Sequence, residues 1–176
     1  ALRLNPTHPV ATSNLAVLLA RQGQLNEGLL AIERATLYDG VEPIIASNRA
    51  LMALEADRID EALAAARKAV ELAPDEVPAL LALAIVSATA GVPDQAIPLY
   101  NKILDKEPKH AAAGPNAAFV QTLTTATPAD LLRQRQRWYE ANRFTGKIEP
   151  HANDKSTTRP LRVGYVGGDF KSHSAA

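Results

Sequence analysis

The sequence predicts an all-α protein, a right-handed solenoid of stacked helical hairpins, and three observations lead to this prediction. Residues that stop helices recur every 34 positions, at Pro6, Gly40, Pro74 and Pro108. Small residues recur at fixed places within the same period. The composition is 47% hydrophobic but only 5% aromatic, and a chain in which alanine and leucine dominate suits closely packed helices.

The same period fixes the interior of each hairpin. One set of residues lies at the turn between the two helices, where a left-handed backbone ends the first helix: Gly23, Asp57 and Gly91. A second set is small because two antiparallel helices cross there: Ala16, Ala50, Ala84, Gly28, Ala62 and Ala96. A 34-residue repeat with these features is typical of tetratricopeptide repeats, and we expect them to occupy residues 1–126.

The register predicts where each helix begins and ends. The expected pairs are 9–22 with 25–38, 43–56 with 59–72, and 77–90 with 93–106, followed by a first helix of a fourth unit at 115–126. Residues 1–4 have the pattern of the end of a preceding second helix. The sequence therefore predicts that the solenoid extends beyond these units.

After Ala126 the repeat pattern changes. Thr127 as N-cap and Pro128 at the first helical position predict a transition helix over 127–144. We expect the Trp138 side chain of this helix to pack against the last repeat. Residues 145–160 are polar and rich in turn-forming residues, as in a linker. Residues 161–176 then contain a β-branched and aromatic run that predicts the first strand and turn of a truncated α/β domain.

Composition excludes several classes of function. The chain has no cysteine and a formal net charge of zero, so it lacks thiol chemistry and the basic surface of a general nucleic-acid or membrane binder. Its histidines are widely separated, which argues against a metal site. Because no stretch resembles a signal peptide or a membrane span, the expected location is cytoplasmic. The oligomeric state is left open.

The segment over 159–173, RPLRVGYVGGDFKSH, resembles the opening of the catalytic domain of O-linked N-acetylglucosamine transferases of the Spindly type and their bacterial relatives. That family has the same order of repeats, transition helix, linker and transferase domain. The resemblance implies a UDP-N-acetylglucosamine donor for a longer parent enzyme, and His173 as a catalytic residue of a complete domain. Residues 1–176 contain no glycine-rich cofactor motif, so we expect no cofactor and no activity from the chain by itself.

The resemblance also points to asparagines in the repeats. Asn14, Asn48 and Asn116 share one repeat position, with Ala82 interrupting the series. In the resembling transferases, asparagines at this position hold the backbone of a protein substrate, because an amide both donates and accepts hydrogen bonds. Ordinary hydrogen bonding between helices of the stack is the equal alternative.

Two functions follow from this sequence. One is the protein-recognition arm of a protein O-GlcNAc transferase, which modifies serine and threonine. The other is a free-standing adaptor that binds a partner peptide. A version of the adaptor that clamps acidic tails with Lys and Arg is not expected, because equivalent positions hold Ser13, Val17, Pro78 and Ala82.

Overall fold

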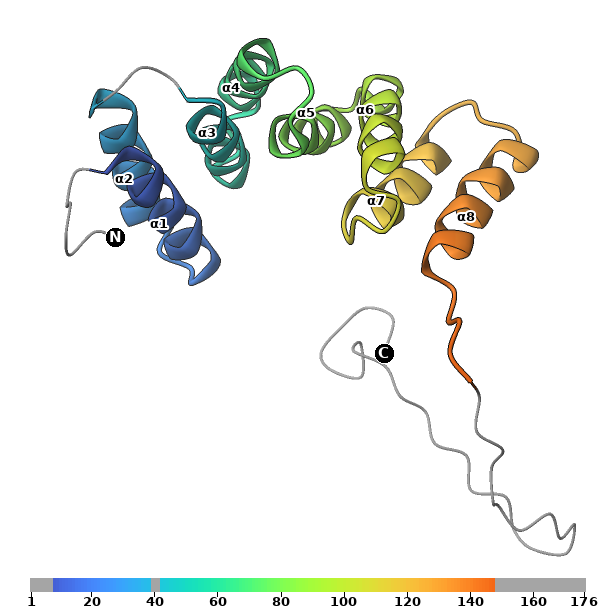
Figure 1. Cartoon of the computed structure of the whole chain (residues 1–176). Helices are drawn as coiled ribbons and strands as arrows, with labels where there is room; N and C mark the ends of the chain where they lie inside the picture. The colour runs from blue at the N-terminus through green and yellow to red at the C-terminus, as the bar shows by residue number, and fades with distance from the viewer. Residues whose placement is uncertain (1–7, 39–41, 148–176) are drawn as a thin grey trace, which may run out of the picture. The chain divides into compact units, whose positions relative to one another are not determined.

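The computed structural model describes residues 8–38 and 42–147, and every regular element among them is helical (Figure 1). The elements are α1 (Pro9–Arg21), α2 (Leu25–Tyr38), α3 (Pro43–Glu55), α4 (Ile59–Leu72), α5 (Val77–Thr89), α6 (Pro93–Lys106), α7 (Ala113–Val120), the 3₁₀ turn η1 (Gln121–Leu123) and α8 (Pro128–Asn142). The first six lie within one residue of the predicted bounds. An all-α solenoid is therefore confirmed for this part of the chain.

Each of the first three hairpins turns in the same way. Gly23, Asp57 and Gly91 have φ values of 81°, 58° and 78°, and the residue after each donates its N–H five residues back, as in Gln24 to Leu19 at 2.9 Å. Hydrogen bonds of this kind, as in the Schellman motif, satisfy carbonyls at the end of the first helix that would otherwise lack partners. Asp57 adopts a left-handed conformation because a short polar side chain tolerates it better than most.

Small residues let the two helices of a hairpin approach closely. Ala16, Ala50 and Ala84 are completely buried. A Cβ atom at Gly28 would lie 2.8 Å from the carbonyl oxygen of Ala16 and 2.7 Å from the Met52 side chain, closer than packed atoms allow. The periodic glycine and alanines are thus required by the spacing of the helices.

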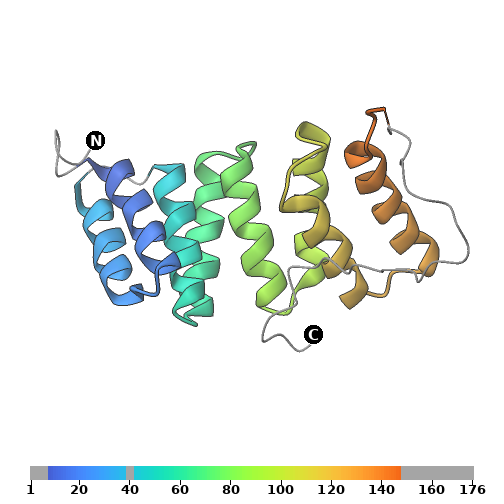
Figure 2. The same ribbon diagram turned by 90° about the horizontal axis from the view of Figure 1, so that it is seen from below.

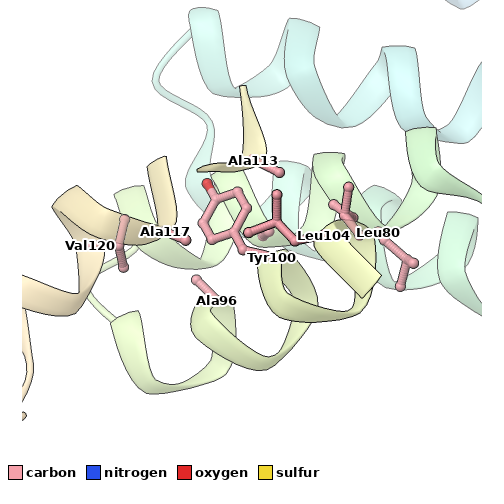
Figure 3. Close-up of a cluster of buried hydrophobic side chains, with 9 residues drawn as sticks. Leu80, Ala96, Tyr100, Leu104, Ala113, Ala117 and Val120 are labelled. Carbon is pink, nitrogen blue, oxygen red and sulfur yellow. The ribbon is translucent and has the colours of Figure 1, made fainter. Parts of the chain in front are cut away.

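The hairpins stack in chain order, and Figure 2 shows the same succession from a second direction. α3 contacts both α1 and α2, and α5 contacts both α3 and α4. One cluster of buried apolar residues joins the third hairpin to α7. Figure 3 shows its Tyr100 ring among Ala96, Ala117 and Leu104. Because the apolar clusters join residues of one hairpin with residues of the next, much of the stability comes from the stack.

The fourth unit departs from the first three. The sequence predicts that α7 continues to residue 126, but the helix ends at Val120 and passes through η1. The hydroxyl groups of Thr122 and Thr124 bond backbone carbonyls of the preceding turn, at 2.6 and 2.8 Å. Local bonds of this kind compete with the helical ladder, and the chain becomes extended at Thr124.

α8 takes the place of a second helix in this unit. Its N-cap, Thr127, lies 34 residues after Pro93, the first residue of α6. Gln134 donates to Asn101 of α6 at 3.2 Å, and Arg137 pairs with Asp105 at 2.7 Å. The segment expected as a transition helix is therefore also packed as part of the stack.

The chain divides into two compact units, 1–143 and 144–176, and the second is described only for residues 144–147. The linker expected over 145–160 falls almost entirely outside the described residues. So do the predicted strand and turn at 161–176, including His173. The structure shows no strand in the residues it describes.

Candidate functional site

The asparagines at one repeat position lie on the face formed by the first helix of each hairpin, α1, α3, α5 and α7. We call this the first-helix face. Asn14 is exposed, Asn116 is partly buried, and Asn48 is only 8% exposed. The structure therefore does not present the three amides as an equal row.

Asn48 is used within the stack. Its side-chain nitrogen donates to the Ser13 hydroxyl at 3.0 Å and to the Asn14 side-chain oxygen at 3.1 Å. An amide nitrogen carries two hydrogens, so both donors of Asn48 are occupied. The contact joins α1 to α3, which is the alternative that the sequence leaves open for these residues. Their role in peptide binding stays a prediction.

Asn116 lies against Tyr100 of α6. Burial raises the pKa of the Tyr100 hydroxyl, and a hydrogen bond from Asn116 offsets part of that rise. Ala82, the remaining member of the series, is buried and apolar. Asn14 is the one exposed member of this series, and Asn116 is partly accessible.

Beside the asparagines runs a row of apolar side chains that the sequence patterns above do not mark as a site. Three residues further along each first helix stand Val17, Leu51, Ile85 and Phe119, and we call this row the apolar lane. The first three are half-buried, whereas Phe119 is 66% exposed. The sequence does contain a signal for this row, because its four apolar residues are spaced 34 positions apart.

Two hollows open along the apolar lane. The first has a volume of about 240 Å³ and is lined by Val17, Leu51, Ile85 and their neighbours on α1 and α3. The second, of about 250 Å³, is lined by Ile85, Phe119, Asn116 and adjacent residues. Ile85 borders both hollows, so the two hollows adjoin along the apolar lane.

The rim of the first hollow is charged. Arg21 and Glu55 line it on successive first helices, and both are exposed. Over the ranges 8–38 and 42–147, neither side chain takes part in an ion pair or hydrogen bond within the protein. The same repeat position continues as Thr89 and Leu123, so the rim changes from charged to apolar along the chain.

A further hollow, lined by Arg49 and Glu61 among others, has a structural explanation. Arg49 and Glu61, which both line it, form a salt bridge of 2.9 Å. The hydrogen bond from Arg49 holds the pKa of the Glu61 carboxyl below its usual range, and the nearby charge of Arg58 acts in the same direction. A carboxylate held ionised by guanidinium groups is poorly suited to accept and return a proton near neutral pH.

Two further features are absent from the described part of the chain: a group of metal ligands and a membrane-spanning helix. It holds no group of three or more residues arranged to ligate a metal ion. None of its helices has the length and apolar character needed to cross a membrane. His8 and His110 each accept hydrogen bonds from backbone N–H groups at the start of a helix, which accounts for both side chains locally.

Comparisons with known proteins agree with the repeat architecture. Residues 53–117 match one tetratricopeptide repeat model, and residues 9–29 match another. The chain therefore contains tetratricopeptide repeats. Protein O-mannosyl-transferase TMTC3 of Homo sapiens is 29% identical over 113 residues, which are 62% of this chain but 12% of TMTC3.

Two solved structures show the same fold. One is YrrB, a repeat protein with an unusual peptide-binding site, with a TM-score of 0.63, 17% identity, and coverage of 80% of this chain and 72% of YrrB. The other is the first repeat domain of Spaghetti (RPAP3), bound to the HSP90 peptide SRMEEVD, with a TM-score of 0.58, 16% identity, and coverage of 65% and 91%. At these identities the likeness concerns the fold.

Proposed function

We propose that these tetratricopeptide repeats form a protein-interaction module that binds a segment of a partner protein on the first-helix face. The observation that carries the proposal is the pair of hollows that meet at Ile85. Recessed apolar surface with a few polar groups at its edge is what peptide-binding grooves offer. Two proteins that share the fold support it: YrrB has a peptide-binding site, and the Spaghetti domain holds a peptide.

A peptide library displayed on phage tests this proposal. We expect the chain to enrich a family of related sequences, and we expect Leu51→Ser to abolish the enrichment. Leu51 borders the first hollow, whereas Leu37 lies on α2 and is 80% exposed, so Leu37→Ser is the matched control and should enrich the same family. Enrichment that survives Leu51→Ser would place binding elsewhere.

We further propose that the module is the recognition arm of a protein O-GlcNAc transferase. The support is the resemblance over residues 159–173 and its histidine, His173. A parent enzyme of this class would transfer N-acetylglucosamine from UDP-N-acetylglucosamine to serine or threonine of the protein held by the repeats. The name of TMTC3 also denotes a sugar transferase, although this chain spans only 12% of it.

The transferase proposal has its own test. The proposed parent enzyme, produced with its complete transferase domain, should transfer labelled N-acetylglucosamine to a serine-containing acceptor fused to a library-selected peptide. His173→Ala should abolish transfer, and residues 1–176 alone should not bind the nucleotide sugar in calorimetry. A longer polypeptide that binds the peptide but never transfers sugar would favour the adaptor instead.

A further inference from the structure

Another hollow opens between α7 and α8, outside the apolar lane. It has a volume of about 410 Å³ and is lined by Pro115 and Ala118 of α7 and by Arg135, Trp138 and Tyr139 of α8. None of these residues lines the two hollows of the lane. We propose that this second surface binds a proline-rich segment of a partner protein, in the polyproline II conformation, with an acidic residue beside its prolines.

The hollow lies where the fourth hairpin differs from the first three. In those hairpins a buried alanine on the first helix meets a small residue on the second, as where Gly28 lies against the carbonyl of Ala16. In the fourth, Ala118 stands at the alanine position but remains partly exposed, and the Trp138 ring lies against Gly114. Because an indole ring between two helices prevents their close contact, space remains beside Ala118.

One face of α8 carries the three side chains that define the ligand. Arg135, Trp138 and Tyr139 are separated by three and four positions, so they are neighbours on the helix surface. Trp138 is 38% exposed and Tyr139 is 59% exposed. Tryptophan, tyrosine and arginine are the residues in which binding energy at protein interfaces is most often concentrated. The hollow therefore has the composition of a docking site.

The lining of the hollow selects the backbone of the ligand. Pro115 has no N–H group, and Ala118 and the ring faces are apolar, so the wall offers few hydrogen-bond partners. A β-strand would leave its N–H and C=O groups unpaired against such a wall. A polyproline II segment has no internal hydrogen bonds and a solvated backbone, and its prolines have no N–H to satisfy. Aromatic-lined grooves bind segments of this kind.

Arg135 sets the charge of the ligand. Three other arginines of α8 pair with carboxylates of the protein: Arg133, Arg137 and Arg143. Arg135 is exposed, and within the described ranges it takes part in no ion pair or hydrogen bond. Its guanidinium is therefore available to a carboxylate of the ligand.

The spacing along α8 places that carboxylate relative to the prolines. Arg135 precedes the two aromatic residues by three and four positions, a rise of about 4.5–6 Å along the helix. Two residues of polyproline II rise about 6 Å. An acidic residue two positions from a proline can thus reach Arg135 while the proline ring contacts Trp138 and Tyr139.

Fluorescence tests the inference directly, because the chain has a single tryptophan and it forms a wall of this hollow. Residues 1–176 are titrated with the peptide SEAPPPAES and with two matched peptides. SEAAAAAES lacks the prolines, and SKAPPPAKS reverses the charge. We expect SEAPPPAES to shift the tryptophan emission and to bind at least about tenfold more tightly than either of the others. Raising NaCl from about 0.05 to 0.5 M should weaken it at least about twofold, because exposed charges are screened.

Variants of the chain locate the binding. Ala118→Leu fills the hollow and should abolish the emission shift, while circular dichroism checks that the variant is folded. Arg135→Gln should weaken SEAPPPAES about three- to fivefold whether or not Ala118→Leu folds. Arg133→Gln, a change of the same kind on the same helix but outside the hollow, is the matched control and should have less than a twofold effect. Leu51→Ser, in the apolar lane, should have none.

Several outcomes overturn the inference. Equal binding of SEAAAAAES or SKAPPPAKS would show that the hollow does not recognise an acidic proline-rich segment. An emission shift that survives Ala118→Leu in a folded variant, or no shift with any of the three peptides, would do the same. These results leave the proposed function intact, because that function is tested separately by library enrichment and Leu51→Ser. Failure of the library test would likewise leave binding of SEAPPPAES unaffected.

Discussion

The first three hairpins and the fourth follow one register but hold their helices together differently. In the first three, a buried alanine on the first helix faces a glycine or alanine on the second, and the helices pack closely. In the fourth, Asp130 takes the place of that small residue, and Ala118 is partly exposed. There Trp138 of α8 packs over Gly114 of α7 instead.

This difference shows that the period alone does not determine packing. A repeat position can keep its place in the stack although its side chain no longer makes the close contact between the two helices. The loss of close packing in the fourth hairpin is accompanied by local capping. Thr127 and Asp130 cap α8 reciprocally, whereas α4 and α6 begin without a side-chain cap.

The largest predicted effect compares one substitution in both regions. Ala50 and Ala118 occupy the same repeat position, but only Ala50 is completely buried. Ala50→Leu should lower the free energy of unfolding by about 3 kcal/mol, because an overpacked core must shift its helices. Ala118→Leu faces a hollow beside Trp138 and should change it by less than about 0.5 kcal/mol. Urea unfolding measures both, and equal losses would show that the hairpins do not differ.

The next effect concerns Trp138, which packs between α8 and α7 at Gly114. A Cβ at position 114 would collide with the Trp138 ring, so Gly114→Ala should destabilise the protein by about 1–2 kcal/mol and shift the emission of the sole tryptophan. In a Trp138→Ala background the same change should stabilise by up to about 1 kcal/mol, because alanine favours helix. A double-mutant cycle measures the coupling. No coupling would mean that Trp138 does not set the spacing of α7 and α8.

A smaller effect is expected from the cap of α8. Thr127→Ala removes the hydroxyl that accepts from the Asp130 N–H at 3.3 Å, and should cost about 1 kcal/mol. Amide hydrogen exchange should rise in the first turn of α8 and not in α6. Thr127→Ser keeps the hydroxyl and is the control. Unchanged exchange in α8 would remove the capping argument.

The smallest effect is a pH dependence in the second hairpin. The pKa of Glu61 is lowered chiefly by its hydrogen bond with Arg49. Its contribution to stability is therefore present above the usual glutamate pKa and is lost as pH falls through the lowered value. Glu61→Gln should cost no more than about 0.5 kcal/mol at pH 7, and the cost should be smaller at pH 3, by urea unfolding at both. A cost that grows toward acid pH would contradict this assignment.

Much of the fold can be predicted from the sequence because the signals are local and repeated. Pro74 and Gly91 mark helix boundaries, and the small residues mark the crossings. The end of α7 at Val120 is not predictable in this way, since threonine hydroxyls compete with the helix only in a particular backbone geometry. Nor does the sequence show that Asn48 bonds Ser13, because that contact joins residues 35 positions apart.

The candidate site likewise has features that the sequence predicts and features that only the structure shows. The repeat register aligns the asparagine positions, yet their burial depends on how closely α1 and α3 pack. The apolar lane is present in the register, since Val17, Leu51, Ile85 and Phe119 are 34 residues apart. Periodic apolar residues in helices usually mean core. Only the structure shows that this row borders two open hollows.

The central claim is that the first-helix face holds a polypeptide segment along the apolar lane. A crystal structure of residues 1–176 with a peptide selected from the displayed library tests it most directly. We expect the peptide to lie across α1, α3 and α5, with apolar side chains beside Val17, Leu51 and Ile85. A peptide seated on α2, α4 and α6 would contradict the account.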